Sequence, residues 1–347
     1  MNPRVSIVIL NWNGWKDTLE CLESLYRVSY PNYDIIVVDN NSTDDSVQKI
    51  KEYAEGKIHV SSKFFIYNSK NKPIKVFEIT EDEAKQGKFN RPLYEKIDPD
   101  RRIILIKNKD NYGFTKGNNI GAKFALNILN PNYILFLNND TVVDSTFLDE
   151  LIKISESQFH AGILGPAVYW YESNIIQFAG GSQKLTFFIP KHNTEYLSDA
   201  SREVDYIYGA CMLLNTKMIK EIKLLDEALW SFREENEYAL RAKQKGWKCI
   251  YVPYSRIWHK GGSSFGRMNR KIAYLLGKND MYILVKYGHI YEVAIFILFV
   301  VPINMTTYLR IYCKDEDCYH LKEIFNEVIL PYLNGILKIT DNKGVRK

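Results

Sequence analysis

The sequence predicts an α/β fold built on a mostly parallel sheet. Short apolar runs, such as residues 5–10, lack the polar alternation of a half-exposed strand, which is typical of strands buried on both faces. Between these runs lie segments with apolar residues at helical spacing, such as Leu19, Leu22 and Leu25. Strands that alternate with helices at these lengths favour a parallel sheet with right-handed crossovers.

The expected elements follow this alternation through the first half of the chain. The strands cover residues 5–10, 33–38, 103–106 and 133–137, and the helices cover residues 17–26, a segment opening at Asp44 and Ser46, and residues 117–129. Residues 61–102 interrupt the pattern, and their apolar stretches 64–67 and 74–79 predict a hairpin inserted on the surface. The second half, which opens with the run 163–166, is mixed and richer in aromatic residues and glycine.

Composition bounds the class of protein. Hydrophobic residues make up 46% and charged residues 25% of the 347 residues, which is an ordinary globular composition. This length favours about two domains, or one domain with a large elaboration. A net charge of +5 is too small to indicate a nucleic-acid partner.

Cysteine use and the N-terminus favour a reducing, cytoplasmic location. The five cysteines are an odd number spread thinly along the chain, so they do not suggest a disulfide framework. Cys313 and Cys318 flank four charged residues, and a zinc site there remains a weaker alternative. The apolar run near the N-terminus is too short for a signal-peptide core and lacks a cleavage site.

Polar clusters follow three of the expected strands. They are Asn11-Trp12-Asn13-Gly14, residues 39–44 and Asn138-Asn139-Asp140-Thr141. Ligands of open parallel sheets bind beyond the carboxyl ends of the strands, so three clusters at one edge predict a binding site. Any single cluster is also explained by turn formation and helix capping.

Asp140 is the expected metal ligand of this edge. It directly follows the strand 133–137, and a carboxylate there can hold a hard cation such as Mg²⁺ or Mn²⁺ that bridges phosphate oxygens. The loop 111–119 precedes a helix and offers small residues for close backbone approach to a ligand.

The second half contains an acidic helix start and a late histidine. Glu234 and Glu235 open a helix in which Glu237 and Arg241 form a stabilising i,i+4 pair. Acids at a helix start are also favoured by the helix dipole alone. His259, as a lone histidine, is on local grounds more often structural than a ligand.

Taken in order, these segments resemble the family 2 glycosyltransferases with the GT-A fold, a Rossmann-like, mostly parallel sheet, and especially their rhamnosyltransferase-like branch. The resemblance is carried by residues 5–13, 36–44, 111–114, 117–119, 137–140, 208–214 and 234–241 and by His259, and covers about residues 4–265. Leu137-Asn138-Asn139-Asp140 looks like the family's DxD metal motif with asparagine in place of the first acid. Residues 208–214 look like its acceptor-side Gly-Ala segment, and residues 234–241 like its ED-x-D-L-x-x-R helix.

The resemblance implies a domain organisation. A GT-A glycosyltransferase domain would cover residues 1–265, with a nucleotide-binding half at about 1–145 and an acceptor half at about 146–265. The insertion would lie at about 61–102. Beyond the residues that the resemblance covers, we expect a C-terminal helical region, with a membrane-associated segment, over residues 266–347.

The resemblance also implies the roles of individual residues. Asp39 would contact the base or ribose of a nucleotide-sugar donor, in a pocket shared with Asn11, Asn13, Asn111, Gly117, Asn118 and Asn138. Asp140 would hold Mn²⁺ or Mg²⁺, and His259 would complete the metal or diphosphate site.

The implied reaction is a direct displacement with inversion at the anomeric carbon, in which the metal offsets charge on the departing diphosphate. Glu235 falls where the family has its aspartate base and would accept the proton of the acceptor hydroxyl. Because glutamate is one methylene longer than the family's aspartate, Glu234 remains an alternative base.

A non-catalytic sugar-nucleotide-binding protein is a second possible function. A sugar-1-phosphate nucleotidyltransferase is less favoured, because its Gly-rich basic loop after the first strand is missing.

The C-terminal segment 293–309 carries no charged residue, and basic and aromatic residues flank it. It is shorter than a spanning helix needs and contains Pro302. We expect peripheral membrane contact through about residues 290–310, at the inner face of the cell membrane, where it would meet a glycan or lipid-linked acceptor. A buried helix and a full membrane span are the alternatives.

Overall fold

The computed structural model describes residues 2–185, 190–195, 199–261, 270–296 and 298. The chain forms two compact units, the first from residues 1–182 and 192–266 and the second from residues 183–191 and 267–347. The zinc alternative at Cys313 and Cys318 and most of the segment 293–309 lie outside the described residues.

The first unit is built on one mixed sheet of eleven strands among the described residues. The strands of the sheet are β1 (Val5–Asn11), β2 (Tyr33–Asp39), β3 (Lys75–Thr80), β4 (Arg102–Lys107), β5 (Tyr133–Asn138), β6 (Thr141–Val143), β7 (Ala161–Trp170), β8 (Ile176–Phe178), β11 (Arg202–Val204), β12 (Cys211–Asn215) and β13 (Lys248–His259). Two short strands outside it are β9 (Gly181–Ser182) and β10 (Lys191–His192). The order across the sheet is β11-β13-β7-β12-β5-β1-β2-β4-β3, with β6 beside β13 and β8 beside β7.

Helices connect and cover these strands. They are α1 (Trp15–Leu25), α2 (Ser46–Ala54), α3 (Glu81–Gln86), α4 (Arg91–Glu95), α5 (Gly113–Phe124), α6 (Phe147–Ser157), α7 (Thr216–Ile222) and α8 (Glu234–Gln244), with a 3-10 turn at Pro99–Arg101 and a π-helical turn at Ala125–Leu129. The second unit contains α9 (Arg270–Tyr287) and α10 (Ile290–Ile295). None of the helices that the structure describes is both long and apolar enough to cross a membrane.

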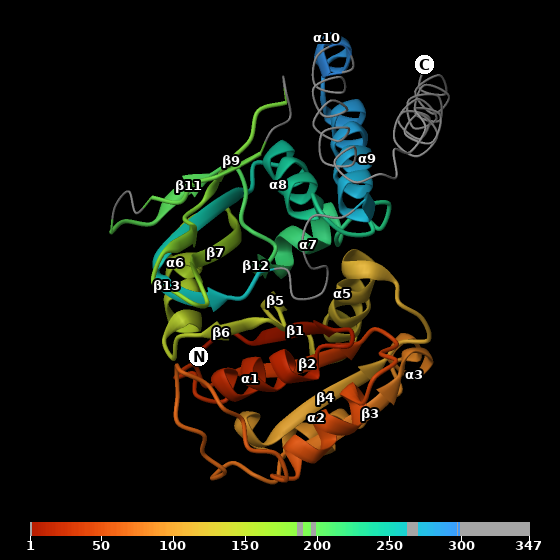
Figure 1. The fold of residues 1–347 in the computed structure, drawn as a ribbon, viewed down its shortest axis with the longest axis vertical. Coiled ribbons are helices and arrows are strands. Elements are labelled where there is room, and N and C mark those ends of the chain that lie inside the picture. The colour runs from red at the N-terminus through yellow and green to blue at the C-terminus, as the bar shows by residue number, and fades with distance from the viewer. Residues whose placement is uncertain (1, 186–189, 196–198, 262–269, 297, 299–347) are drawn as a thin grey trace, which may run out of the picture. The chain divides into compact units, whose positions relative to one another are not determined.

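The parallel half confirms the strands expected from the apolar runs. β5, β1, β2, β4 and β3 pair in parallel, and β2 is buried along its whole length. The crossover from β1 to β2 and the crossover from β4 to β5 run in opposite directions along the sheet. Right-handed crossovers therefore put α1 and α5 on opposite faces, as Figure 1 shows.

The expected surface hairpin in residues 61–102 is wrong. Residues 64–67 form no strand, and β3 pairs in parallel with β4 as the edge strand of the main sheet. α3 and α4 lie between β3 and β4 in the chain, so this segment completes a further β-α-β crossover. An alternating apolar pattern suits a half-exposed edge strand as well as a hairpin strand, so the pattern alone does not identify the pairing partner.

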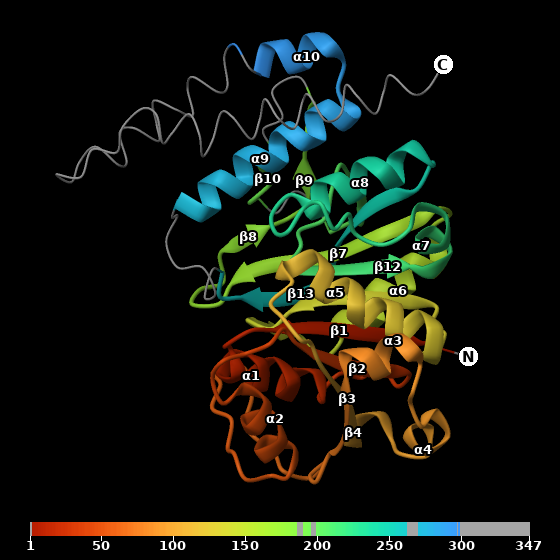
Figure 2. The ribbon, with the colours of Figure 1, turned by 90° about the vertical axis from the view of Figure 1, so that its right-hand side faces the viewer.

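The other half of the sheet is mixed. β12 pairs antiparallel with both β5 and β7, while β13 runs parallel to β7 with a register shift between Val252 and Arg256. β6 pairs antiparallel with the end of β13, where Thr141 lies opposite His259. Figure 2 shows α7 and α8 beside this half of the sheet.

Helix α5 ties the parallel half to the segment that precedes α8. The Thr115 hydroxyl donates a hydrogen bond to the carbonyl of Leu229, and Asn119 Nδ2 donates to the carbonyl of Leu225 over 2.9 Å. Both asparagine and threonine are buried, so these bonds are shielded from water. The segment that leads into α8 is thus held against α5.

We expect Gly113→Ala to lower the free energy of unfolding by about 2–4 kcal/mol, because two costs add. Gly113 has a φ of +74°, which disfavours an L-residue, and an added Cβ would lie 2.5 Å from the Trp230 ring. Denaturant unfolding measures the change. Gly209→Ala is the matched control, because its added Cβ would meet its nearest neighbour at an ordinary 3.5 Å. Equal stability of the two variants would show that Gly113 carries no such constraint.

Candidate active site

The carboxyl ends of β1 and β2 are joined by a buried hydrogen-bond network. Parallel register places Asn11 opposite Asp39, and Asn11 Nδ2 donates to Asp39 Oδ1 over 2.8 Å. Asp39 also accepts from the backbone N–H and the hydroxyl of Ser42, and Asn11 accepts from the Thr18 hydroxyl. The predicted residues Asn11 and Asp39 therefore lie together, and Thr18 and Ser42 fix their orientation.

Asn13 organises the turn beyond this network. Its φ of 51° lies in the left-handed region that asparagine tolerates. Asn13 Oδ1 accepts the backbone N–H groups of Thr43 and Asp44 at 2.7 and 3.2 Å. Asn13 thus binds the loop after β2, and its side chain carries the turn-forming role that the sequence left open for such residues.

Asn40 has several hydrogen-bond partners. It belongs to the polar cluster 39–44 but is not among the predicted site residues. The side chain is buried and donates to Asn111 Oδ1 over 2.9 Å and to the carbonyl of Gly113, and it accepts from Asn108 Nδ2 over 3.0 Å. The predicted residue Asn111 is thereby fixed to the end of β2. A buried asparagine that binds three residues of the loop 108–113 is a signal only a structure reveals.

Gly117 and Asn118 lie at the start of α5 behind the same edge. An added Cβ at Gly117 would lie 2.5 Å from Leu10 Cδ1, so glycine lets the helix approach β1. Asn118 is buried and donates to the carbonyl of Phe114 one turn earlier over 3.0 Å. Both predicted residues are close to the strand ends, and Gly117 has a packing role there.

The segment after β5 is held from both sides. The Asn138 backbone N–H donates to the carbonyl of Ala210, and Asn139 Nδ2 donates to the Thr18 hydroxyl over 3.0 Å. Asn138 lies opposite Leu10 in the register of β5 and β1. These bonds bring Asp140 to the same edge as the network around Asn11.

Asp140 and His259 face each other. Asp140 Oδ1 lies 3.2 Å from His259 Nε2, and the two residues are 6% and 3% exposed. His259 Nδ1 lies 2.8 Å from Gln177 Oε1, an acceptor, so Nδ1 donates to Gln177 and Nε2 is the ring nitrogen that faces Asp140. Gln177 is a site residue that the sequence analysis missed, because a glutamine in a three-residue strand gives no local signal.

A carboxylate oxygen and an imidazole lone pair form a donor set that fits a divalent cation such as Mn²⁺. Within the described part of the chain, no group of three or more histidine, cysteine, aspartate or glutamate side chains could hold a metal ion. Asp140 and His259 would therefore supply two ligands, and the remaining positions would be open to substrate oxygens or water.

Lys260 fixes the end of β13 to α1. Its Nζ lies 2.6 Å from Asp17 Oδ1 and 2.7 Å from Glu20 Oε2, and its backbone N–H donates to the carbonyl of Asp140. Burial alone would lower the pKa of Lys260, but the bonds to the two acids outweigh it and raise the pKa. The Tyr171 hydroxyl also donates to Glu20, and burial, together with this bond, raises the pKa of Tyr171 to about 12.

Glu234 and Glu235 are buried together at the start of α8, with 6% and 9% exposure. A Cβ at Gly209 would lie 3.5 Å from Glu234 Oε1 and 3.9 Å from Glu235 Oε2, so both carboxyl groups face the backbone of Gly209. Burial and the neighbouring charge of Glu235 raise the pKa of Glu234 well above its ordinary range. Glu234 Oε2 has no hydrogen-bond partner among the described residues, which leaves this carboxyl group available to a ligand.

The backbone that leads into this pair is strained. Phe232 and Arg233 have φ values of 68° and 69°, and two successive left-handed residues other than glycine are uncommon. One turn into the helix, Arg241 lies 2.7 Å from Glu237 and also donates to the carbonyls of Ile222 and Leu224. The expected Glu237–Arg241 pair is confirmed, and it holds α8 to the end of α7.

Tyr208 connects the two pairs: its ring packs against His259, and the next residue, Gly209, faces Glu234 and Glu235. Its ring centroid is 5.6 Å from that of His259, at an interplanar angle of 77°. Burial, followed by the charges of Glu235, Asp140 and Glu234, raises the pKa of the Tyr208 hydroxyl. The Asp140–His259 pair and the Glu234–Glu235 pair therefore border one site, in which Tyr208 stays a neutral hydrogen-bond donor.

Comparison with known proteins identifies family 2 glycosyltransferase sequence over most of the chain. The sequence profile described as "Glycosyl transferase family 2" matches residues 6–93, and the profile described as "Glycosyltransferase like family 2" matches residues 66–273. The second match alone covers more than half of the chain.

Two relatives of named activity are similar over about two fifths of the chain. The chain is 26% identical over 152 residues to the low-salt glycan biosynthesis hexosyltransferase Agl10 of Haloferax volcanii, covering 41% of this chain and 47% of the relative. It is 23% identical over 151 residues to the N-acetylglucosaminyl-diphospho-decaprenol L-rhamnosyltransferase of Mycobacterium tuberculosis (strain H37Rv), covering 39% and 49%. The matched segments span about half the length of each relative.

A solved structure shows the fold. The crystal structure of GalNAc-T7 with UDP, GalNAc and Mn²⁺ superposes with a TM-score of 0.59 at 16% identity, covering 96% of this chain and 57% of that chain. The mostly parallel sheet expected from the sequence is thus that of a GT-A glycosyltransferase.

We expect Glu234→Gln to stabilise the protein increasingly as pH rises from 5 to 8. Above the ordinary carboxyl pKa of 4.5, the unfolded chain releases this proton while the folded chain retains it, so folding stability falls with pH by up to about 1.4 kcal/mol per pH unit. The glutamine removes that loss. Denaturant unfolding at several pH values measures the difference from the wild-type protein.

Glu78→Gln is the matched control for this titration. Hydrogen bonds from Lys107 and Lys51 lower the pKa of Glu78, so the gain with rising pH should be absent there. A difference between Glu234→Gln and wild type that does not change with pH would contradict the raised pKa.

Proposed function

This chain belongs to glycosyltransferase family 2, and on that basis we propose that it transfers a sugar from a nucleoside-diphosphate sugar to a hydroxyl group of a glycan or lipid-linked acceptor, with inversion. One observation carries the proposal beyond the family. The Tyr208 ring packs against His259 of a metal-type pair, Asp140 and His259, and the next residue, Gly209, faces a proton-accepting pair, Glu234 and Glu235. A donor diphosphate and an acceptor hydroxyl need these two groups on either side of the anomeric carbon.

The nucleotide would bind at the carboxyl ends of β1, β2 and β5. The proposed lining comprises Asn11, Asn13, Asp39, Asn111, Gly117, Asn118 and Asn138, all of which lie at or behind this edge. The hydrogen bonds among Asn11, Asp39 and Ser42 hold their side chains in place before a ligand arrives. Such preorganisation lowers the entropy lost on binding.

Asp140 and His259 would hold Mn²⁺ or Mg²⁺. A bound divalent cation supplies positive charge that stabilises the departing diphosphate. The chain prepares this site through Gln177, which fixes the histidine tautomer, and through Lys260, which fixes the end of β13. The GalNAc-T7 structure, which contains UDP and Mn²⁺, supports a nucleotide and a divalent cation as ligands of this chain.

Glu235 would accept the proton of the acceptor hydroxyl, with Glu234 held in its protonated form beside it. Two carboxyl groups that face one point cannot both ionise cheaply, so a proton held on Glu234 lets Glu235 act as the base. A positioned general base contributes ~10²–10⁴-fold to a rate. Exchange of the two roles is the alternative that mutagenesis decides.

A lipid-linked acceptor would place the enzyme at the inner face of the cell membrane. The mycobacterial relative is named for a diphospho-decaprenol acceptor, which supports this class of acceptor. Peripheral membrane contact through about residues 290–310 and a cytoplasmic location are part of the same proposal.

We expect Asp140→Ala to abolish metal-dependent nucleotide binding without unfolding the protein, because one of the two cation ligands is lost. Calorimetric titration of UDP, GDP and dTDP sugars with and without Mn²⁺ measures the affinity, and far-UV circular dichroism checks the fold. Asp144→Ala is the control, because Asp144 lies four residues further along the chain and accepts its hydrogen bonds from Thr146. Unchanged Mn²⁺-dependent affinity in Asp140→Ala would overturn the assigned metal site.

We expect Glu235→Gln to lose about 10²–10⁴-fold of the transfer rate while it keeps donor affinity, because the amide retains the shape but accepts no proton. Glu234→Gln should retain most activity, since an amide N–H replaces the carboxylic acid O–H. Release of nucleoside diphosphate measures both. An inactive Glu234→Gln beside an active Glu235→Gln would exchange the roles, and a wild-type protein that binds but never turns over donor would indicate a non-catalytic binding protein.

A further inference from the structure

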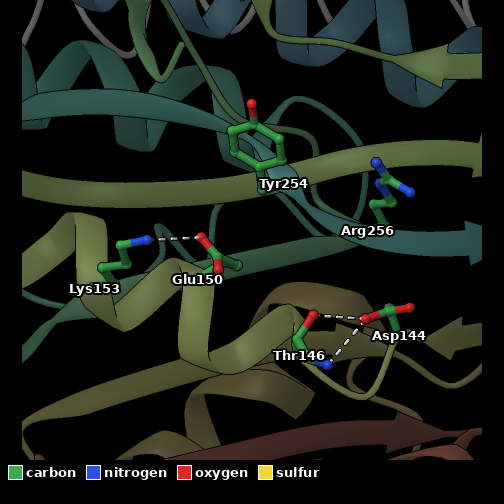
Figure 3. Close-up of a pocket in the computed structure, with 6 residues that line it drawn as sticks. All are labelled: Asp144, Thr146, Glu150, Lys153, Tyr254 and Arg256. Atoms are coloured by element: carbon green, nitrogen blue, oxygen red, sulfur yellow. Dashed lines mark hydrogen bonds and ion pairs between the residues drawn. The ribbon is translucent and has the colours of Figure 1, made fainter. Parts of the chain in front are cut away.

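A surface groove lies along β13, away from the residues of the site described above. It consists of two pockets that share Arg256. One pocket of about 510 Å³ is lined by Asp144, Thr146, Glu150, Lys153, Tyr254 and Arg256, as Figure 3 shows. The other, of about 480 Å³, is lined by Tyr169, Asn174, Ile176, Arg256 and Trp258. We refer to the two together as the β13 groove.

A bulge in β13 builds the groove. The register of β13 with β7 shifts between Val252 and Arg256, so three extra residues lie in β13. Ser255 anchors the bulge through a hydrogen bond from its hydroxyl to the carbonyl of Phe147 over 2.8 Å. Tyr254 on one side of this anchor is 50% exposed, and Arg256 on the other is exposed as well.

The groove and the metal-type pair lie on opposite faces of this part of the sheet. His259 contacts Gln177 of β8, so both side chains share one face. Successive side chains of a strand alternate between faces, so Trp258 and Ile176 lie on the other face. The groove is therefore not an extension of the Asp140–His259 site.

The polar groups on the β13 side of the groove are available to a ligand. In Figure 3, Lys153 pairs with Glu150 and Asp144 accepts from Thr146, while no interaction reaches Tyr254 or Arg256. Among the described residues, the Tyr254 hydroxyl and the Arg256 guanidinium have no side-chain partner, and both residues are exposed, so a ligand can reach them. A row of two aromatic rings with a guanidinium between them thus has unused hydrogen-bonding capacity.

The chemistry of this row identifies the class of ligand. Asp144 and Glu150 balance Lys153 and Arg256, so the lining favours neither an anion nor a cation. Aromatic rings offer flat apolar faces beside polar groups, and sugar rings present flat C–H faces edged by hydroxyls. A guanidinium with several N–H donors suits adjacent hydroxyl groups.

We propose that the β13 groove is a second carbohydrate site that binds a neutral oligosaccharide. This proposal rests on the proposed function in one respect: the oligosaccharide that the groove would bind is the glycan acceptor or product of the enzyme. A second site that holds a glycan raises its effective concentration at the first site without a new contact there. Holding the glycan in the β13 groove is a role separate from the chemistry of Glu235 and Asp140.

An array of neutral and anionic oligosaccharides probed with the full chain tests the proposal. We expect retention of neutral oligosaccharides, with affinity lowered about tenfold or more in the double variant Tyr254→Ala/Arg256→Ala, because an aromatic face and the guanidinium donors are lost. Tyr291→Ala, which removes a tyrosine of similar 56% exposure, is the control and should bind as wild type.

Three results would overturn the proposal: no neutral oligosaccharide retained, equal affinity in the double variant, or retention of anionic glycans alone. A change in sedimentation coefficient in the double variant without a change in sugar binding would also overturn it, in favour of contact between copies of this chain. Asp140→Ala separates the two proposals, because it should keep oligosaccharide binding on the array while it loses metal-dependent nucleotide binding.

Discussion

The antiparallel pairing of β6 with the end of β13 is the constraint on which the candidate site depends. It places Thr141 opposite His259, so the residue before Thr141 faces the histidine, although more than a hundred residues separate them in the chain. β13 is itself fixed by its long parallel pairing with β7. The metal-type pair is thus a product of sheet register, and the side chains around it only refine its geometry.

The acidic pair at the start of α8 has a different physical basis. Burial and mutual repulsion both disfavour two ionised carboxylates, and the preceding left-handed residues Phe232 and Arg233 add backbone strain. The remainder of the fold stabilises this arrangement, through the contacts of α5 with residues 225–230 and through the Glu237–Arg241 pair. The hydrogen bonds from α5 and the Glu237–Arg241 ion pair therefore offset the cost of the strained backbone and of the buried acids.

Sequence patterns predict the parts of this protein in which local chemistry and tertiary structure agree. Continuous apolar runs identify β1, β2, β4 and β5, because a strand buried on both faces must be apolar throughout. The pattern fails for β3, whose half-exposed residues are compatible with more than one pairing partner. The ends of the buried strands, and with them Asn11, Asp39 and Asp140, can be located for the same reason that the strands can.

Residues whose importance comes from long-range contacts escape such patterns. Gln177 and Asn40 are unremarkable in their local sequence, and their roles depend on partners that the fold brings to them. Asn13 shows the reverse case, in which a residue selected for ligand contact is also engaged in holding a turn. Glu234 and Glu235 are visible in sequence as acids at a helix start, but their burial against Gly209 is not.

Lys260 has a consequence for how the two ends of the site respond to each other. Its ammonium group bridges the first turn of α1, which follows the turn after β1, and its backbone contacts Asp140. A shift of the β1 turn would therefore be transmitted to Asp140 unless the ion pairs to Asp17 and Glu20 break. In the proposed enzyme, a ligand that orders one end would order the other, and thermodynamic linkage would make the effect mutual. Occupation of the nucleotide edge and of the metal-type pair would then be cooperative, with one lysine as the mechanical link.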